Sequence, residues 1–157
     1  MKYISIVILL FLFTGCVSSS DLLDEHMTRG VPDNASVFII YSDNDDQSLF
    51  DEISRQLVRD GHRIETDSEL LTIETEGVDI GQSTFARYTL FIEDGAITGR
   101  ANWMIGSQAH AMTTALSGIN MNANWEKAEW TTGRPKRAYA SLVDFMLQFE
   151  HSSHEFN

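Results

Sequence analysis

The chain has 157 residues, of which 23 are acidic and 11 are lysine or arginine, and its formal net charge is −12. This length predicts one domain that is large enough to bury a core without disulfides. The negative charge argues against nucleic acid as a partner and against a polybasic contact with anionic lipid, because both need a basic surface. The single cysteine, Cys16, excludes a disulfide within the chain.

The first sixteen residues have the pattern of an export signal. Lys2 is positively charged, residues 4–13 are almost entirely apolar, and the small residues Thr14 and Gly15 stand directly before Cys16. The apolar run is too short to span a bilayer, which needs roughly 20 residues. This segment resembles the signal peptide and lipobox of bacterial lipoproteins, although Phe13 stands where that family usually has an aliphatic residue.

The resemblance implies that residues 1–15 are removed and that Cys16 carries the lipid as the first mature residue. The chain would then be a membrane-anchored protein of the cell envelope. Val17, rather than aspartate, follows the cysteine, which by the sorting rule of enteric bacteria implies the outer membrane with the domain facing the periplasm. The alternative is an ordinary secretory signal with a cysteine nearby. Residues 16–34 predict a flexible tether.

Residues 35–150 predict a single domain that begins with a strand and a helix. Residues 36–42 are rich in β-branched and aromatic side chains and indicate a central strand. Residues 48–60 place apolar side chains on one helical face, with a capping box of Ser48 and Asp51 at the start and Gly61 at the end. The following segments are expected to be two strands and a loop: 62–66, 70–76 and 77–81.

The clearest hairpin joins residues 84–93 to residues 96–104. Asp94-Gly95 between two alternating runs is the strongest short-range hairpin signal. The alternation predicts one apolar face made of Ala86, Tyr88, Leu90, Ile92, Ile97, Gly99, Ala101 and Trp103.

The last third of the chain is less regular. Residues 105–133 are small and polar, and they indicate either a short helix within 107–116 or a flap, with a possible returning strand in 125–132. Residues 135–149 predict a final helix with Pro135 in its first turn. Residues 151–157 predict a polar tail.

Together these elements predict an α+β fold. We expect a two-layer sandwich with a mainly antiparallel sheet, in the order β-α-β-β-β-(β)-α, and two helices on one face. From about residue 37 to residue 149 this order resembles the small domains of bacterial envelope lipoproteins, including the helix-grip-like domains of BamC in the β-barrel assembly machinery. The segments that carry the resemblance are VFIIYS, LFDEISRQLVRDGHRIE, ETDSELLTIETE and KRAYASLVDFML. BamC has several domains, and no catalytic residue is implied.

We predict no cofactor, metal site or catalytic group. Residues 43–47 (DNDDQ) alternate oxygen ligands as a calcium loop does, but Ser48 and Ser54 stand where such a loop has glycine and glutamate. His151 and His154 lack a third metal ligand nearby. His110, with its methionine neighbours, is interpreted as packing rather than as a copper site.

Trp103, Trp125 and Trp130 are the candidate ligand or partner contacts. Aromatic residues beside an asparagine-rich segment are typical of glycan and peptide sites, but they are also typical of packing between a sheet and helices. Our first hypothesis is a non-enzymatic interaction or scaffold module with an envelope protein as partner, which predicts an exposed apolar patch or a free sheet edge. The alternative is a periplasm-facing lipoprotein that binds a small ligand, a glycan or a metal.

Overall fold

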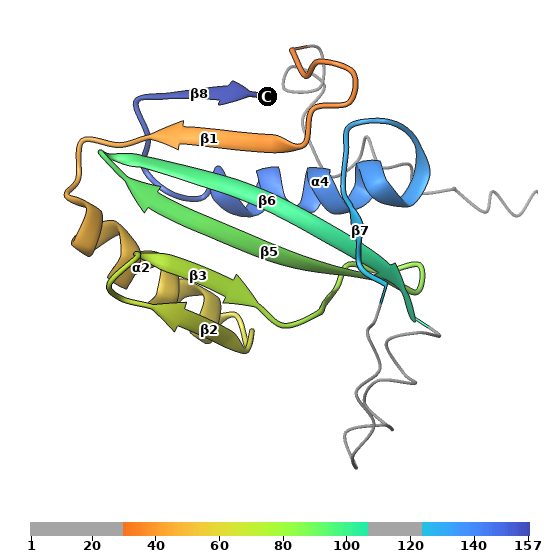
Figure 1. Ribbon diagram of the computed structural model, residues 1–157, viewed down its shortest axis with the longest axis horizontal. Coiled ribbons are helices and arrows are strands. Elements are labelled where there is room, and N and C mark those ends of the chain that lie inside the picture. Colours follow the sequence, from red (N-terminus) through yellow and green to blue (C-terminus); the bar gives the residue numbers. More distant parts are fainter. Residues whose placement is uncertain (1–29, 107–123) are drawn as a thin grey trace, which may run out of the picture.

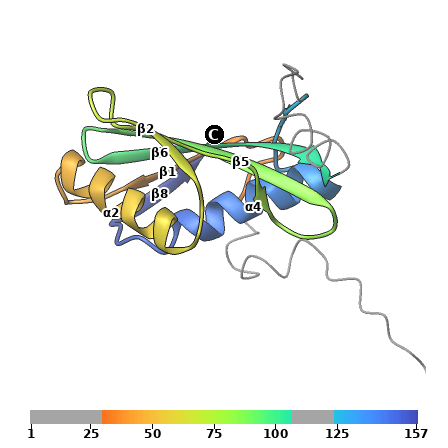
Figure 2. The same cartoon turned by 90° about the horizontal axis from the view of Figure 1, so that it is seen from below.

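The computed structural model describes residues 30–106 and 124–157. They form two layers, an antiparallel sheet and two helices that both lie on one face of it (Figures 1 and 2). This confirms the predicted α+β sandwich. The elements are β1 (Val37–Tyr41), α2 (Asp46–Arg59), β2 (Ile64–Asp67), β3 (Thr72–Thr75), β4 (Val78–Asp79), β5 (Thr84–Glu93), β6 (Ala96–Ile105), β7 (Glu126–Lys127), α4 (Gly133–Met146) and β8 (Ser153–Phe156).

The sheet has the order β2-β3-β5-β6-β1-β8, with β4 paired to β5 and β7 paired to β6. Its centre is the hairpin of β5 and β6, which has the predicted bounds to within one residue. Asp94 and Gly95 have φ values of 53° and 72°, as a two-residue turn of this kind requires. A Cβ atom at position 95 would lie 2.9 Å from the carbonyl oxygen of Ser42, so glycine is needed there for space as well.

Helix α2 begins earlier than predicted because Asp45, not Ser48, is its N-cap. The Asp45 carboxylate accepts hydrogen bonds from the Ser48 backbone N–H (3.0 Å) and from the Ser48 hydroxyl (2.6 Å). These bonds lower the pKa of Asp45. At the other end Gly61 has φ 85°, and His62 donates its backbone N–H to Leu57, which forms the expected glycine C-cap.

The prediction of a polar tail at residues 151–157 was wrong, because residues 153–156 form the edge strand β8. It pairs with β1, and the rings of Phe156 and Phe38 lie 4.9 Å apart. The Asn157 carbonyl accepts the backbone N–H groups of Ser36 (2.7 Å) and Val37 (2.8 Å). These main-chain bonds to β1 form without an apolar pattern in the strand itself. The predicted loop at 77–81 likewise contains the short strand β4.

Helix α4 packs closely on the middle of β6. Gly99 is the reason, since a Cβ atom there would overlap the sulfur of Met146 and lie 3.2 Å from Leu142 Cδ1. Both side chains are fully buried. The predicted hairpin face also lies in this core, with Ala86, Tyr88, Leu90, Ile92, Ile97 and Ala101 all buried.

We therefore predict that Gly99→Val lowers the free energy of unfolding by about 1–3 kcal/mol, because overpacking forces α4 away from β6. Urea unfolding measures this change. Met146→Ala alone should also destabilise, by about 2–5 kcal/mol, because it leaves a cavity. In the double variant the cavity receives the new methyl groups. The decrease in the free energy of unfolding should therefore be smaller than the sum of the decreases in the two single variants. Additive losses would contradict the close contact at Gly99.

Candidate functional site

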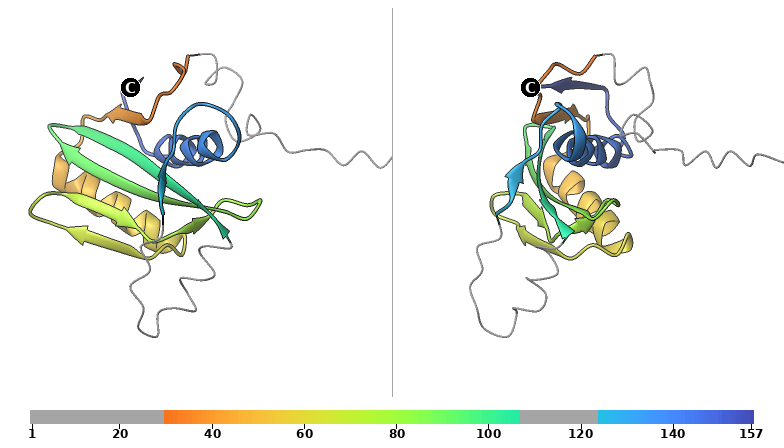
Figure 3. Two further views of the ribbon diagram at one scale, coloured as in Figure 1. Left: turned by 45° about the vertical axis from the view of Figure 1, so that its right-hand side comes forward. Right: turned by 90° about the vertical axis from the view of Figure 1, so that its right-hand side faces the viewer.

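No described helix covers the second face of the sheet (Figure 3). We call this surface the open face. Its side chains come from alternate positions of the central strands. In β1 these positions are Val37 and Ile39, whereas Phe38 and Ile40 are buried on the helix side. The large apolar or aromatic side chains exposed there include Tyr41 and Phe91, at 37% and 40%.

Strand register arranges the open face into two neighbouring rows that run across the strands. One row alternates apolar side chains with threonines and consists of Ile39, Thr98, Phe91 and Thr72. The next row carries charge and consists of Val37, Arg100, Thr89 and Glu74. Residues opposite each other on paired strands are in contact distance, so these rows form one continuous surface.

A hollow of about 600 Å³ lies over these rows. Its lining includes Val37, Phe91, Arg100 and Lys127. Lys127 pairs with Glu129 at 2.9 Å, whereas Arg100 is exposed and forms no ion pair with any described residue. Arg100, which has no ion-pair partner among the described residues, thus lies near the exposed ring of Phe91. Arginine and aromatic residues are enriched at the centres of protein interfaces.

The three candidate tryptophans do not come together. Trp130 is 6% exposed in the core, where its ring makes an edge-to-face contact with Tyr139. Trp103 pairs with the buried Ala86, so it lies on the helix side of the sheet. Trp125 lies on the open face, where the guanidinium of Arg87 stands 4.7 Å from its ring centre. Core packing therefore accounts for Trp130, and no shared aromatic platform forms.

Other candidates have structural partners. Asp45 caps α2. Asp46 accepts hydrogen bonds from the backbone N–H groups of Asp94 (3.1 Å) and Gly95 (2.8 Å) at the hairpin turn. Two carboxylates of the calcium-loop-like residues 43–47 therefore form structural hydrogen bonds. His151 and His154 have ring centres 5.9 Å apart, next to β1. Among the described residues no group of three or more metal-binding side chains occurs.

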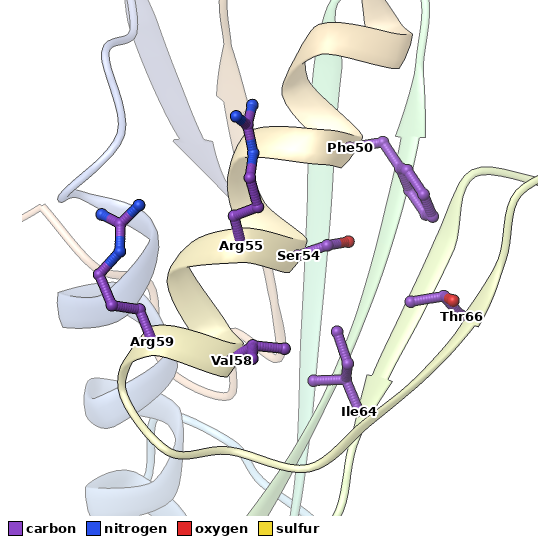
Figure 4. A pocket seen from close by; sticks show the side chains of 7 residues that line it. All are labelled: Phe50, Ser54, Arg55, Val58, Arg59, Ile64 and Thr66. Carbon is purple, nitrogen blue, oxygen red and sulfur yellow. The ribbon is translucent and has the colours of Figure 1, made fainter.

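A second hollow, of about 510 Å³, is the groove between α2 and the edge strand β2 (Figure 4). Phe50, Ser54 and Val58 project from the helix toward Ile64 and Thr66 of the strand. Val58 is 59% exposed, and the hydroxyl of Ser54 is buried without a hydrogen-bond partner. The groove is further lined by two arginines of α2, Arg55 and Arg59, which Figure 4 shows on the side of the helix turned away from β2.

A third, more polar hollow of about 350 Å³ lies where α4 meets β4 and β5. Its lining includes Tyr88, whose hydroxyl is hydrogen-bonded to that of Ser141. Burial raises the pKa of Tyr88 to about 12. Burial also raises the pKa of Asp144 in the same hollow. A phenol with this pKa stays protonated at neutral pH, so Tyr88 is a structural hydrogen-bond partner of Ser141 rather than a base.

Sequence reasoning missed the open face and the groove as sites. The sequence did contain a pattern that indicates the open face. Phe91 is separated from Thr89 and Arg87 by even numbers of residues along β5, so its side chain lies on the same, polar side of the strand. The groove had no such signal, since it needs the placement of α2 over β2. Cys16 and residues 107–123 lie outside the described residues, and no described helix is long and apolar enough to cross a membrane.

Comparison with known proteins found no matching family model and no matching curated protein.

We predict that stability falls as the pH rises from 10 to about 12. The unfolded chain releases the Tyr88 proton near pH 10.0, whereas the folded protein keeps it up to a pKa of about 12. The unfolded state thus binds fewer protons in this window, and each pH unit removes up to about 1.4 kcal/mol. The free energy of unfolding, measured with urea at several pH values between 10 and 12, should fall less steeply with pH in Tyr88→Phe than in the wild-type protein. An unchanged slope in that variant would show that Tyr88 is not the group responsible.

Proposed function

We propose that this chain is a non-enzymatic interaction module of the cell envelope, held at a membrane by a lipid on Cys16. The observation that supports an interaction function is the open face, where Ile39 and the exposed ring of Phe91 flank Thr98 in the row next to Arg100. A partner that buries this surface gains from covering Ile39 and Phe91 and supplies a carboxylate to Arg100.

The proposed location is supported by the sequence. The apolar segment before Cys16 is the basis for a lipid anchor, and Val17 supports the outer membrane with the domain facing the periplasm. The resemblance of residues 37–149 to BamC-like domains supports the same compartment. The alternative of a small-ligand, glycan or metal-binding protein has less support, because Trp103, Trp125 and Trp130 lie apart from one another.

The anchor is tested by metabolic labelling with an alkyne-bearing palmitate in bacterial cells. The wild-type chain should incorporate the label and fractionate with membranes. Cys16→Ser should do neither, because no other cysteine is present to carry the lipid. Equal membrane association of the two proteins would contradict the anchor.

The open face is tested by site-specific photo-crosslinking. A benzophenone amino acid in place of Phe91 should crosslink to a distinct envelope protein in intact cells, because this position lies at the centre of the open face. The same amino acid in place of Glu52, on the exposed side of α2, is the matched control and should give no such product. Identical crosslinking patterns at the two positions would contradict a role for the open face.

A further inference from the structure

Strand β2 has a free edge in the part of the chain that the structure describes. There it is the outermost strand of the sheet and pairs with β3 on one side only. The Arg63 carbonyl accepts the Glu76 backbone N–H (2.9 Å), which makes Arg63 and Glu76 a hydrogen-bonded pair. Because such pairs alternate along antiparallel strands, Glu65 also directs its main-chain groups toward β3, and Ile64 and Thr66 direct theirs outward. The outward groups are available to a further strand.

The two sides of this edge differ in chemistry. On the helix side Ile64 and Thr66 face the groove, whose walls are Phe50 and Val58 (Figure 4). On the opposite side Glu65 and Asp67 are exposed, and Glu65 stands opposite Glu74 of β3. The edge is therefore apolar on one side and acidic on the other.

We propose that the free edge of β2 binds an extended segment of a partner protein in which apolar residues alternate with lysine or arginine. An added strand places successive side chains on opposite sides. Its apolar residues would enter the groove, while its cations would lie beside Glu65 and Asp67. The net charge of −12 favours a cationic partner.

One polar group lies between the apolar walls of the groove. The buried hydroxyl of Ser54 has no partner among the described residues, so it offers a hydrogen bond within the groove. A second copy of the chain is a poor occupant, because pairing β2 with itself would bring Glu65 and Asp67 against their own copies. Glu65 and Asp67 belong to the margin of the open face, but the outward main-chain groups of β2 and the groove do not, so strand addition at β2 and binding over Phe91 and Arg100 can fail separately.

The direct test is binding of a fluorescein-labelled peptide of alternating valine and lysine to the purified full chain, followed by fluorescence anisotropy. It should bind about tenfold more tightly than a peptide with the same valines and lysines in two blocks, a difference of about 1.4 kcal/mol. The two peptides have equal charge, so equal affinities would overturn the proposal in favour of general attraction to an acidic protein. A peptide of alternating valine and glutamate should not bind.

The edge itself is tested with Thr66→Pro. Proline removes the outward N–H without affecting the bonds to β3, and it should weaken binding about tenfold. Thr66→Val keeps the N–H and is the matched control, with unchanged binding expected. If the proline variant does not fold, a valine–lysine peptide N-methylated on the residues that face β2 makes the same test on the wild-type chain. Full binding by that peptide would overturn strand addition.

The acidic side is tested with Glu65→Lys. This variant should lose binding of the valine–lysine peptide, because a cation then stands next to the lysines of the added strand. Glu52→Lys makes the same change in net charge on the exposed side of α2 and should change affinity less than about twofold. Equal losses in the two variants would overturn the assigned position of the peptide.

Discussion

The close approach of α4 to β6 at Gly99 determines how the two layers meet. Met146 and Leu142 occupy the space that a side chain at position 99 would fill, so the helix sits directly on the sheet backbone. Helix α2 then covers the remaining part of the same face, over β5, β3 and β2. Both described helices therefore lie on one face of the sheet, and no described helix covers the other face.

This one-sided arrangement explains why the surfaces of interest are of two kinds. The open face is broad and mixed, with apolar and charged rows that follow from strand register. The edge of β2 is narrow and offers main-chain groups as well as side chains. Flat interfaces and strand addition depend on different interactions, because the first buries side chains and the second also pairs the backbone.

Local patterns predicted most of the fold. The hairpin was predictable because alternation and Asp94-Gly95 act within a few residues, and the end of α2 was predictable because Gly61 has a local conformational role. Strand β8 was not, because its pairing with β1 relies on backbone groups and on side-chain contacts with β1 that are distant in sequence, among them Phe156 with Phe38 and Glu155 with Tyr41. The separation of the tryptophans also needed the register of the sheet, which no short segment contains.

The carboxylate of Asp46 joins the start of α2 to the tip of the hairpin, and the bonded residues are 48 and 49 positions apart in the chain. The backbone N–H groups of Asp94 and Gly95 would otherwise face water at an exposed turn and exchange with solvent rapidly. In this domain they are covered by an acceptor from a distant segment. Exchange of these amides therefore requires their bonds to the Asp46 carboxylate to break, so the two amides report on the contact between the start of α2 and the hairpin.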